Sequence, residues 1–289
     1  MSDITIINDT QQSQLVTNGL ARNGELYLKA EGSTDAGSVV VYDSGSWKTF
    51  SNDYVSGLSN TYSVDFDGTD DYVGFSSNPN LTVKSVSFWF NQPTSKNTMI
   101  VSGLGGVVYT TYGGFGTDTN GKIRWNDGYA GGTSATNVFS YNTWNHYAAV
   151  YVPSGYTDTA GSTTSTGAGW AVYVNNTRVD LQASNGSYGT TPVTTTSEFK
   201  IGREGQRQLY VFEGKLDEVA IFTTSITASD VATIYNNGSP NDISSLSPAG
   251  WWRMGDNDGG TGTTITDQGS GGNDGTLTNG PTFSTTVPS

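Results

Sequence analysis

The residues of this chain that could carry acid–base chemistry are few. His146 is the only histidine, and there is no cysteine. His146 shares one face of a predicted strand with Trp144, Ala148 and Val150, which is typical of a hydrogen-bonded core side chain rather than of a general base. No Gly-x-Ser-x-Gly elbow precedes a predicted helix, and no glycine-rich phosphate loop with a lysine is present. The sequence therefore disfavours nucleophilic hydrolases and nucleotide-binding proteins.

Carboxylates are the remaining candidates for catalysis. Glu213, Asp217 and Glu218 lie close together on one predicted strand. Because side chains alternate along a strand, we expect Glu213 and Asp217 on one face and Glu218 on the opposite face. Such a separation does not suit a pair of carboxylates that act on the same bond.

Composition indicates many short strands joined by tight turns. The 289 residues include 38 glycines and only 13% charged residues, with abundant Thr, Ser, Asn, Tyr and Val. The formal net charge is −13, without a basic cluster, so neither nucleic acid nor an anionic membrane is an expected partner. We expect no membrane span and no secretion signal, because no long apolar run is present.

Period-two patterns predict the strands of a β-sandwich from about residue 59 onward. Val86, Phe88 and Phe90 share one face of a predicted strand, and Ser87 and Trp89 share the other. Further strands are predicted over residues 63–66, 72–75, 144–152, 169–174, 199–202, 214–222 and 250–256. Residues 67–71 are predicted to be the turn of an acidic β-hairpin.

Two segments differ from this pattern. Residues 1–58 are predicted to form a separate small β-rich module, with strands over 25–30, 39–42 and 45–50. Thr227 and Asp230 have the spacing of a capping box, which predicts one short helix through Val231, Ile234 and Tyr235. Residues 236–240 should end this helix.

An ordered series of motifs resembles the laminin-G-like, concanavalin-A-like jelly-roll family. The motifs are Phe66-Asp-Gly68 with Asp71-Tyr-Val73, Val86-Ser-Phe-Trp89, Trp144-Asn-His-Tyr-Ala148, Val172-Tyr-Val-Asn175, Ile201-Gly202 and Gly214-Lys-Leu-Asp-Glu-Val219. The resemblance implies an all-β, two-sheet antiparallel jelly-roll sandwich over residues 59–289. Residues 250–289 would supply a closing strand and a glycine-rich loop, or would begin a second sandwich completed by a neighbouring chain.

The resemblance bears on catalysis because glucanases with this jelly roll carry a Glu-x-Asp-x-x-Glu pattern on one strand. That pattern is absent from this chain. We therefore predict that the protein is not an enzyme, and a glycan hydrolase is the weaker alternative.

Calcium is the one candidate cofactor. In similar domains a glycine-rich segment lies near a metal on the sandwich rim, and here that segment carries Asp256, Asp267 and Asn273, which Asp217 could approach from a neighbouring strand. Hard cations prefer such clustered oxygen ligands. The alternative is that these residues form turns by binding their own backbone. Asp65, Asp67, Asp70 and Asp71 lack the spacing of an EF-hand loop and are expected to form a solvated hairpin.

Aromatic residues interleaved with glycine suggest a contact surface for a glycan or a protein partner. These residues are Tyr109, Tyr112, Phe115, Trp125 and Tyr129. Flat rings beside accessible backbone suit sugar stacking, and the same ring types occupy the centres of protein interfaces and protein cores.

The first 58 residues, above all 40–50, resemble the N-terminal segment of structural proteins of bacteriophages, particularly marine ones. This resemblance implies a virion structural protein, either a capsid decoration or a component of a head or tail fibre. It would lie on the virion surface, as a homo-oligomer in contact with capsid or tail proteins and with host-surface glycans. A soluble carbohydrate-binding lectin is the alternative.

Overall fold

The computed structural model describes residues 5–7, 26–29, 39–43, 46–50, 58–105, 113–126, 131–134, 136–156, 167–183, 189–205 and 209–289. The chain divides into two compact units, Met1–Ser59 and Asn60–Ser289. Within the described residues, no helix is long and apolar enough to cross a membrane.

The first unit contains a four-stranded sheet in the order β1-β2-β3-β4. Its strands are β1 (Thr5–Ile7), β2 (Leu26–Lys29), β3 (Val39–Asp43) and β4 (Ser46–Phe50). β1 pairs with β2 in parallel, whereas β3 pairs antiparallel with both of its neighbours. The sequence patterns predicted the last three strands but gave no sign of β1.

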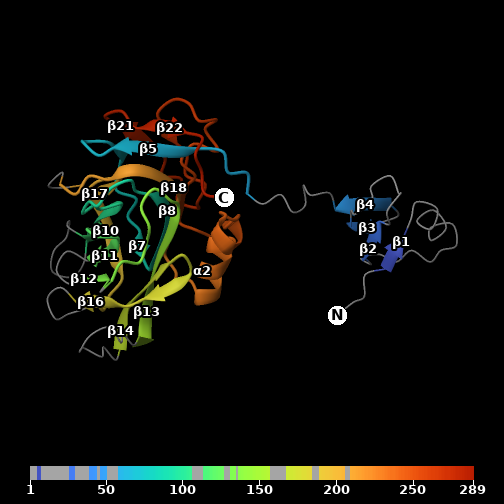
Figure 1. Ribbon diagram of the computed structural model, residues 1–289, viewed down its shortest axis with the longest axis horizontal. Coiled ribbons are helices and arrows are strands. Elements are labelled where there is room, and N and C mark those ends of the chain that lie inside the picture. The colour runs from blue at the N-terminus through green and yellow to red at the C-terminus, as the bar shows by residue number, and fades with distance from the viewer. Residues whose placement is uncertain are drawn as a thin grey trace. The chain divides into compact units, whose positions relative to one another are not determined.

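The second unit is a sandwich of two antiparallel sheets (Figure 1). Over the described residues, one sheet has eight strands in the order β15-β14-β13-β8-β18-β5-β22, and β19 also pairs with β18. These are β5 (Ser63–Asp67), β8 (Ser85–Asn91), β13 (Asn145–Tyr156), β14 (Gly167–Val174), β15 (Thr177–Val179), β18 (Glu213–Phe222), β19 (Gly250–Trp252) and β22 (Thr282–Ser284).

The other sheet has ten strands in the order β16-β12-β11-β10-β9-β17-β6-β21-β20, with β7 paired to β17. Its members are β6 (Tyr72–Phe75), β7 (Thr82–Val83), β9 (Val101–Gly105), β10 (Gly113–Asp118), β11 (Lys122–Asn126), β12 (Gly131–Ser134), β16 (Leu181–Ala183), β17 (Val193–Ile201), β20 (Thr264–Ile265) and β21 (Gly275–Thr278). The predicted all-β, two-sheet antiparallel sandwich is thus confirmed.

The core lies between the two sheets. Alternation along β8 sends Val86, Phe88 and Phe90 into this core, where all three are fully buried. Phe88 stacks on Tyr147 of the neighbouring β13, with ring centres 4.7 Å apart. Because Trp89 points the other way, it lies on the outer face of the same sheet.

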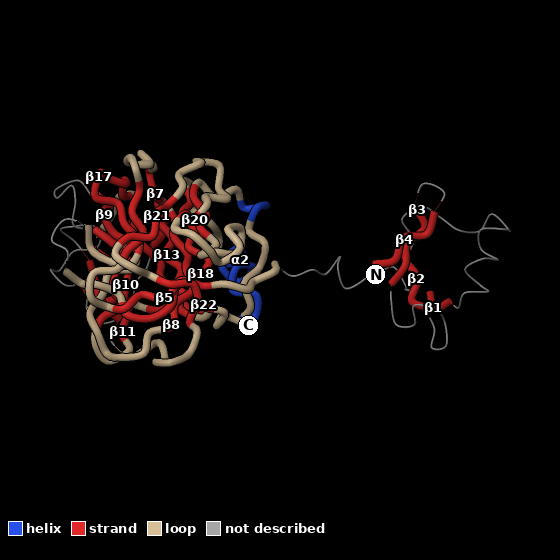
Figure 2. The backbone as a smooth tube through the Cα atoms, turned by 90° about the horizontal axis from the view of Figure 1, so that it is seen from above, coloured by secondary structure: helices blue, strands red, loops and turns tan. Residues whose placement is uncertain are grey.

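A short helix covers that outer face. The helix, α2 (Ala228–Tyr235), begins after Thr227, whose side chain accepts a hydrogen bond from the Asp230 N–H while Asp230 caps the Thr227 N–H. Figure 2 shows α2 to one side of the strands. Tyr235 stacks on Trp89 at 5.7 Å, which fixes the helix over β8. The capping box and the helix confirm the sequence prediction, although Asn236 rather than a glycine takes the left-handed position at the end.

The C-terminal tail completes both sheets of this sandwich. β21 pairs with β6 in one sheet, and β22 pairs with β5 in the other. β19 pairs antiparallel with β18 through residues 219–221, beyond the part of β18 that pairs with β5. The tail therefore does not begin a second sandwich that needs a neighbouring chain.

Residues 67–71 do not form the turn of a β-hairpin, so that prediction is wrong. β5 pairs with β18 and β22, whereas β6 pairs with β17 and β21 in the opposite sheet. The segment is an inter-sheet turn at one end of the sandwich. The sequence pattern cannot separate the two cases, because an acidic, glycine-containing turn suits a β-hairpin and a connection between two sheets equally well.

Candidate functional site

A cleft lies at the edge of the sandwich, where the β14–β15 turn meets the segment after β12. It has a volume of about 500 Å³ and is lined by Ser134, Thr136, Val138, Val174, Asn175, Thr177, Arg178, Val179 and Asp180. We call it the edge cleft. No sequence pattern indicated this cleft, because its lining comes from two separate chain segments without a shared motif.

A tight turn builds one wall of the edge cleft. Asn175 and Asn176 have φ angles of 48° and 62°, and they connect Val174 to Thr177 across the β14–β15 pair. Asparagine tolerates this left-handed region well, and the Asn-Asn pair is the one local signal that the sequence offered. The Asn175 Oδ1 accepts a hydrogen bond of 2.8 Å from the His146 N–H, which anchors the turn on β13.

The edge cleft has an apolar floor and a polar rim. Val138 is partly exposed and forms most of the accessible apolar floor, while Val174 and Val179 beneath it are only 2% and 8% exposed. The rim carries the exposed Thr136 and Thr177 and the partly exposed Arg178. Hydroxyl, guanidinium and carboxylate groups together offer hydrogen-bond donors and acceptors. Such a lining can bind an uncharged, many-hydroxyl ligand.

A smaller, more strongly charged cleft lies beside the inter-sheet turn 67–71. Its volume is about 310 Å³, and it is lined by Asp65, Phe66, Asp67, Asn91, Pro93, Asn142, Glu213, Gly214 and Lys215. Lys215 pairs with Asp65 at 2.9 Å, and Lys96 lies 3.9 Å from Glu213. Three acidic side chains against one lining lysine make this cleft acidic.

The predicted metal ligands separate into two groups. Asp217 and Asp256 come together, with Glu218 as the third member, and one oxygen of each lies within 4.8 Å of the others. Asp267 and Asn273 are not part of this group. Glu218 joins it because a β-bulge interrupts β18: the register shifts between Asp217 and Ala220, and Glu218 has a φ of 47°. The predicted opposite orientation of Asp217 and Glu218 is therefore wrong.

Hydrogen bonds occupy the carboxylates of this group. Asp217 accepts from the Glu218 N–H at 2.8 Å and from the Asn60 amide at 3.0 Å. Glu218 accepts from the Trp251 indole at 2.6 Å and from Arg253 at 2.9 Å.

Arg253 also pairs with Asp256 at 3.2 Å. The other oxygen of Asp256 accepts from the N–H groups of Thr61 and Tyr62. The Arg253 guanidinium already supplies a cation to Asp217, Glu218 and Asp256, so the geometry favours an internal ion-pair cluster over an open metal site. We call these four residues the clamp.

Burial shifts the acidity of the clamp. It raises the pKa of Asp217 well above the ordinary value, and the neighbouring charge of Glu218 raises it further. The pKa of Glu218 is raised to about 7 by burial, against the lowering effect of Arg253 and the Trp251 hydrogen bond.

Asp267 and Asn273 form a turn instead. Asp267 accepts hydrogen bonds from the N–H groups of Trp251, Gly269 and Asn273, each at 2.8 Å. The Asn273 carbonyl accepts from the Trp252 indole at 2.8 Å. The prediction that Asp267 and Asn273 bind the same ion as Asp217 and Asp256 is therefore wrong. The hydrogen bonds support the alternative, in which these two residues form a turn.

His146 lies on the helix-covered face of its sheet, fully buried. Its Nε2 is 2.8 Å from the Ser87 Oγ, and its ring is 5.0 Å from that of Trp89. Burial lowers its pKa to about 3, so the ring stays neutral at physiological pH. A Ser–His pair thus exists, but it is sealed from any substrate.

Two of the five predicted contact aromatics are core residues. Phe115 and Trp125 are 0% and 2% exposed, and both pack against Trp170, at 5.4 and 5.7 Å. The predicted glycan or partner contact is wrong for these two rings, because alternation along β10 and β11 sends them between the sheets. Tyr109, Tyr112 and Tyr129 lie outside the described residues.

The two-sheet sandwich with its helix-covered outer face defines a lectin-like β-sandwich protein. The family model described as the concanavalin A-like lectin/glucanases superfamily, of the laminin-G type, matches residues 67–232. The match covers more than half of the chain, so the chain belongs to this family. No curated protein sequence matches the chain.

Two crystal structures resemble this one. A candidate carbohydrate-binding protein from Bacteroides ovatus ATCC 8483 has a TM-score of 0.56 and 17% identity, over 92% of this chain and 71% of that chain. A heptameric SAP-like pentraxin from Limulus polyphemus has a TM-score of 0.42 and 15% identity, over 61% of this chain and 82% of that chain. At such identities the first likeness shows a shared fold.

Proposed function

We propose that this protein is a non-enzymatic glycan-binding module and that the edge cleft holds the sugar. The observation that carries the proposal is the lining of this cleft. A pyranose ring has apolar C–H patches and a rim of hydroxyls, and the cleft pairs an apolar floor with a rim of hydroxyl, guanidinium and carboxylate groups. Its volume of about 500 Å³ falls within the usual range for small-ligand sites.

Membership of a lectin-type family supports this function. The candidate carbohydrate-binding protein of Bacteroides ovatus shares the fold and is consistent with it. The non-enzymatic part of the proposal is supported by the burial of the titratable groups that catalysis would use. His146 and Asp217 are both 0% exposed, and Glu218 is 5% exposed.

A glycan array followed by calorimetry with the best ligand tests the proposal. Asp180→Asn removes a rim carboxylate and should weaken binding by about tenfold, since hydrogen bonds to charged groups contribute roughly 1.5–3 kcal/mol. Thr177→Val should weaken it by a smaller factor. Thr282→Val is the matched control, because Thr177 and Thr282 are both exposed residues on the two opposite edge strands of one sheet. An array without reproducible binding would refute the proposal.

We further propose that the Met1–Ser59 unit attaches the sandwich to a larger particle, with a virion as the first candidate. A separate compact unit at the N-terminus supports this arrangement. Many copies on one particle would let weak sugar contacts act together. Quantitative mass spectrometry of purified particles should find the chain at a fixed ratio to the main shell protein, and its absence would contradict the attachment.

A further inference from the structure

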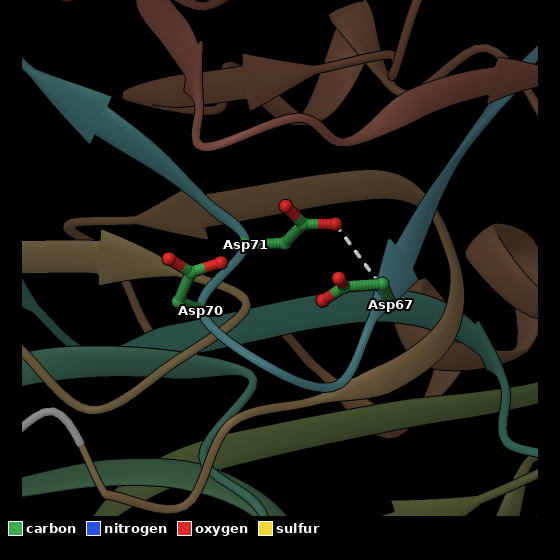
Figure 3. A group of neighbouring side chains, drawn as sticks. All are labelled: Asp67, Asp70 and Asp71. Carbon is green, nitrogen blue, oxygen red and sulfur yellow. Dashed lines mark hydrogen bonds between the residues drawn. The ribbon is translucent and has the colours of Figure 1, made fainter.

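The inter-sheet turn 67–71 gathers three carboxylates that the proposed glycan cleft does not use. Asp67, Asp70 and Asp71 each place an oxygen within 4.8 Å of the other two. Figure 3 shows the Asp71 side chain extending into the turn toward Asp67, with Asp70 beside it. Asp67 and Asp70 are exposed, whereas Asp71 is only 2% exposed.

Asp71 supplies a second, independent observation. Its Oδ2 accepts a hydrogen bond of 2.9 Å from the Asp67 N–H. Its Oδ1 is buried and has no hydrogen-bond partner. A buried carboxylate oxygen without a donor costs roughly 1–3 kcal/mol or more, so native proteins rarely leave one unsatisfied. Burial, together with the charges of Asp67, Asp70 and Asp65, raises the pKa of Asp71.

The nearby basic side chains do not neutralise this group. Lys96 donates to the Gly68 carbonyl at 2.7 Å, and Arg203 donates to the Asp70 carbonyl at 3.4 Å. Both contacts go to the backbone. Within the described part of the chain, no lysine or arginine forms an ion pair with the three carboxylates.

We propose that Asp67, Asp70 and Asp71 bind a divalent cation, with Ca²⁺ the best match. Calcium takes six to eight oxygen ligands in flexible geometry, so carboxylates from an irregular turn, completed by water, suit it better than they suit Mg²⁺. The ion supplies the missing partner of the Asp71 Oδ1, and its two positive charges offset two of the three negative charges. It also fastens the segment that joins the two sheets. Because Asp67 lines the acidic cleft as well, the ion lies at the rim of that cleft.

Calorimetric titration of CaCl₂ into the chelator-treated full chain tests the site, and it requires no glycan. We expect binding and a rise in melting temperature. Asp70→Asn is exposed and should not disturb folding, and it should weaken Ca²⁺ binding by about tenfold or more, because affinity depends on ligand charge. Asp71→Asn should abolish binding.

Asp242→Asn is the matched control. It removes one exposed charge elsewhere, and an asparagine can still accept the Ser244 N–H bond of 2.8 Å. It should bind Ca²⁺ as the unmodified chain does. Absence of Ca²⁺ binding to the unmodified chain would overturn the proposal. Binding that is lost in Asp256→Asn but retained in Asp70→Asn would also overturn it, since the ion would then occupy the buried clamp.

Discussion

The guanidinium of Arg253 lies among three buried carboxylates, those of Asp217, Glu218 and Asp256. One cation cannot offset three anions. Burial is the main cause of the raised pKa values of Asp217 and Glu218, and the charge of Glu218 raises that of Asp217 further. The clamp joins a β-bulge, the start of the sandwich and the C-terminal tail through Asn60, Thr61 and Arg253. We therefore assign it a role in stability, one that depends on pH.

The clamp predicts that the free energy of unfolding falls as pH rises from 4.5 to about 7. When folding raises the pKa of a carboxyl group, the folded state binds the proton more tightly than the unfolded state does. The resulting stabilisation is fully present below the unfolded-state pKa, and it is lost as the pH rises through the folded-state pKa. For Glu218 this window runs from 4.5 to about 7. Urea unfolding of the second unit at several pH values measures the effect.

Asp217→Asn should be more stable than the unmodified chain at pH 8, and the difference should shrink toward pH 5. The amide oxygen still accepts the Glu218 N–H. The amide nitrogen replaces the oxygen that accepts from the Asn60 Nδ2, so the Asn60 amide turns over and presents its Oδ1, which is otherwise buried without a partner. Asp242→Asn serves as the charge control and should show no such gain. Equal pH slopes for the Asp217 variant and the unmodified chain would contradict this account.

At the scale of elements, three short local motifs position the strands and the helix: a β-bulge, a tight turn and a capping box. The β-bulge at Glu218 turns two consecutive acidic residues into one cluster. The turn at Asn175 and Asn176 shapes the edge cleft. The capping box fixes the start of α2, which keeps Tyr235 over Trp89. Each motif depends on a few residues, so it can be tested by single substitutions.

Thr227→Ala should lower the free energy of unfolding by about 1 kcal/mol, because it removes the N-cap acceptor for the Asp230 N–H. Thr233→Ala in the same helix is the matched control. Thr233 is exposed within the helix, and alanine has the higher helix propensity, so this change should be neutral or stabilising by a few tenths of a kcal/mol. Thermal unfolding compares the two, and equal losses would contradict the capping role.

At the scale of the whole molecule, the tail is what closes the sandwich. β21 and β22 cover β6 and β5, two strands from opposite sheets that the inter-sheet turn 67–71 connects. Without the tail both strands would become open edges, which invite pairing with other chains. The proposed Ca²⁺ site lies in that same turn.

Leu277→Asp should destabilise the second unit by about 3 kcal/mol or more, since it places an unpaired charge where a buried leucine packs on the core. Thr276→Asp is the control, because Thr276 is the exposed neighbour on the same strand. Urea unfolding and limited proteolysis of the tail provide the measurements. Similar effects of both changes would show that the tail does not depend on its buried face.

The sequence by itself determined the features that depend on local pattern. Period-two burial predicted β8, the Thr227–Asp230 spacing predicted α2, and the ordered motifs predicted the two-sheet sandwich, all of which hold. These succeed because periodicity and capping involve residues within one turn or strand.

Only the tertiary structure decided the contacts between distant segments. It sent Phe115 and Trp125 into the core, and it placed β5 and β6 in opposite sheets. It joined Asp217 to Asp256 while leaving Asp267 in a turn. The edge cleft likewise combines separate segments. Pairing partners are selected by packing of the whole sandwich, and a single bulge reverses which face a side chain occupies, so local pattern carries no information about either.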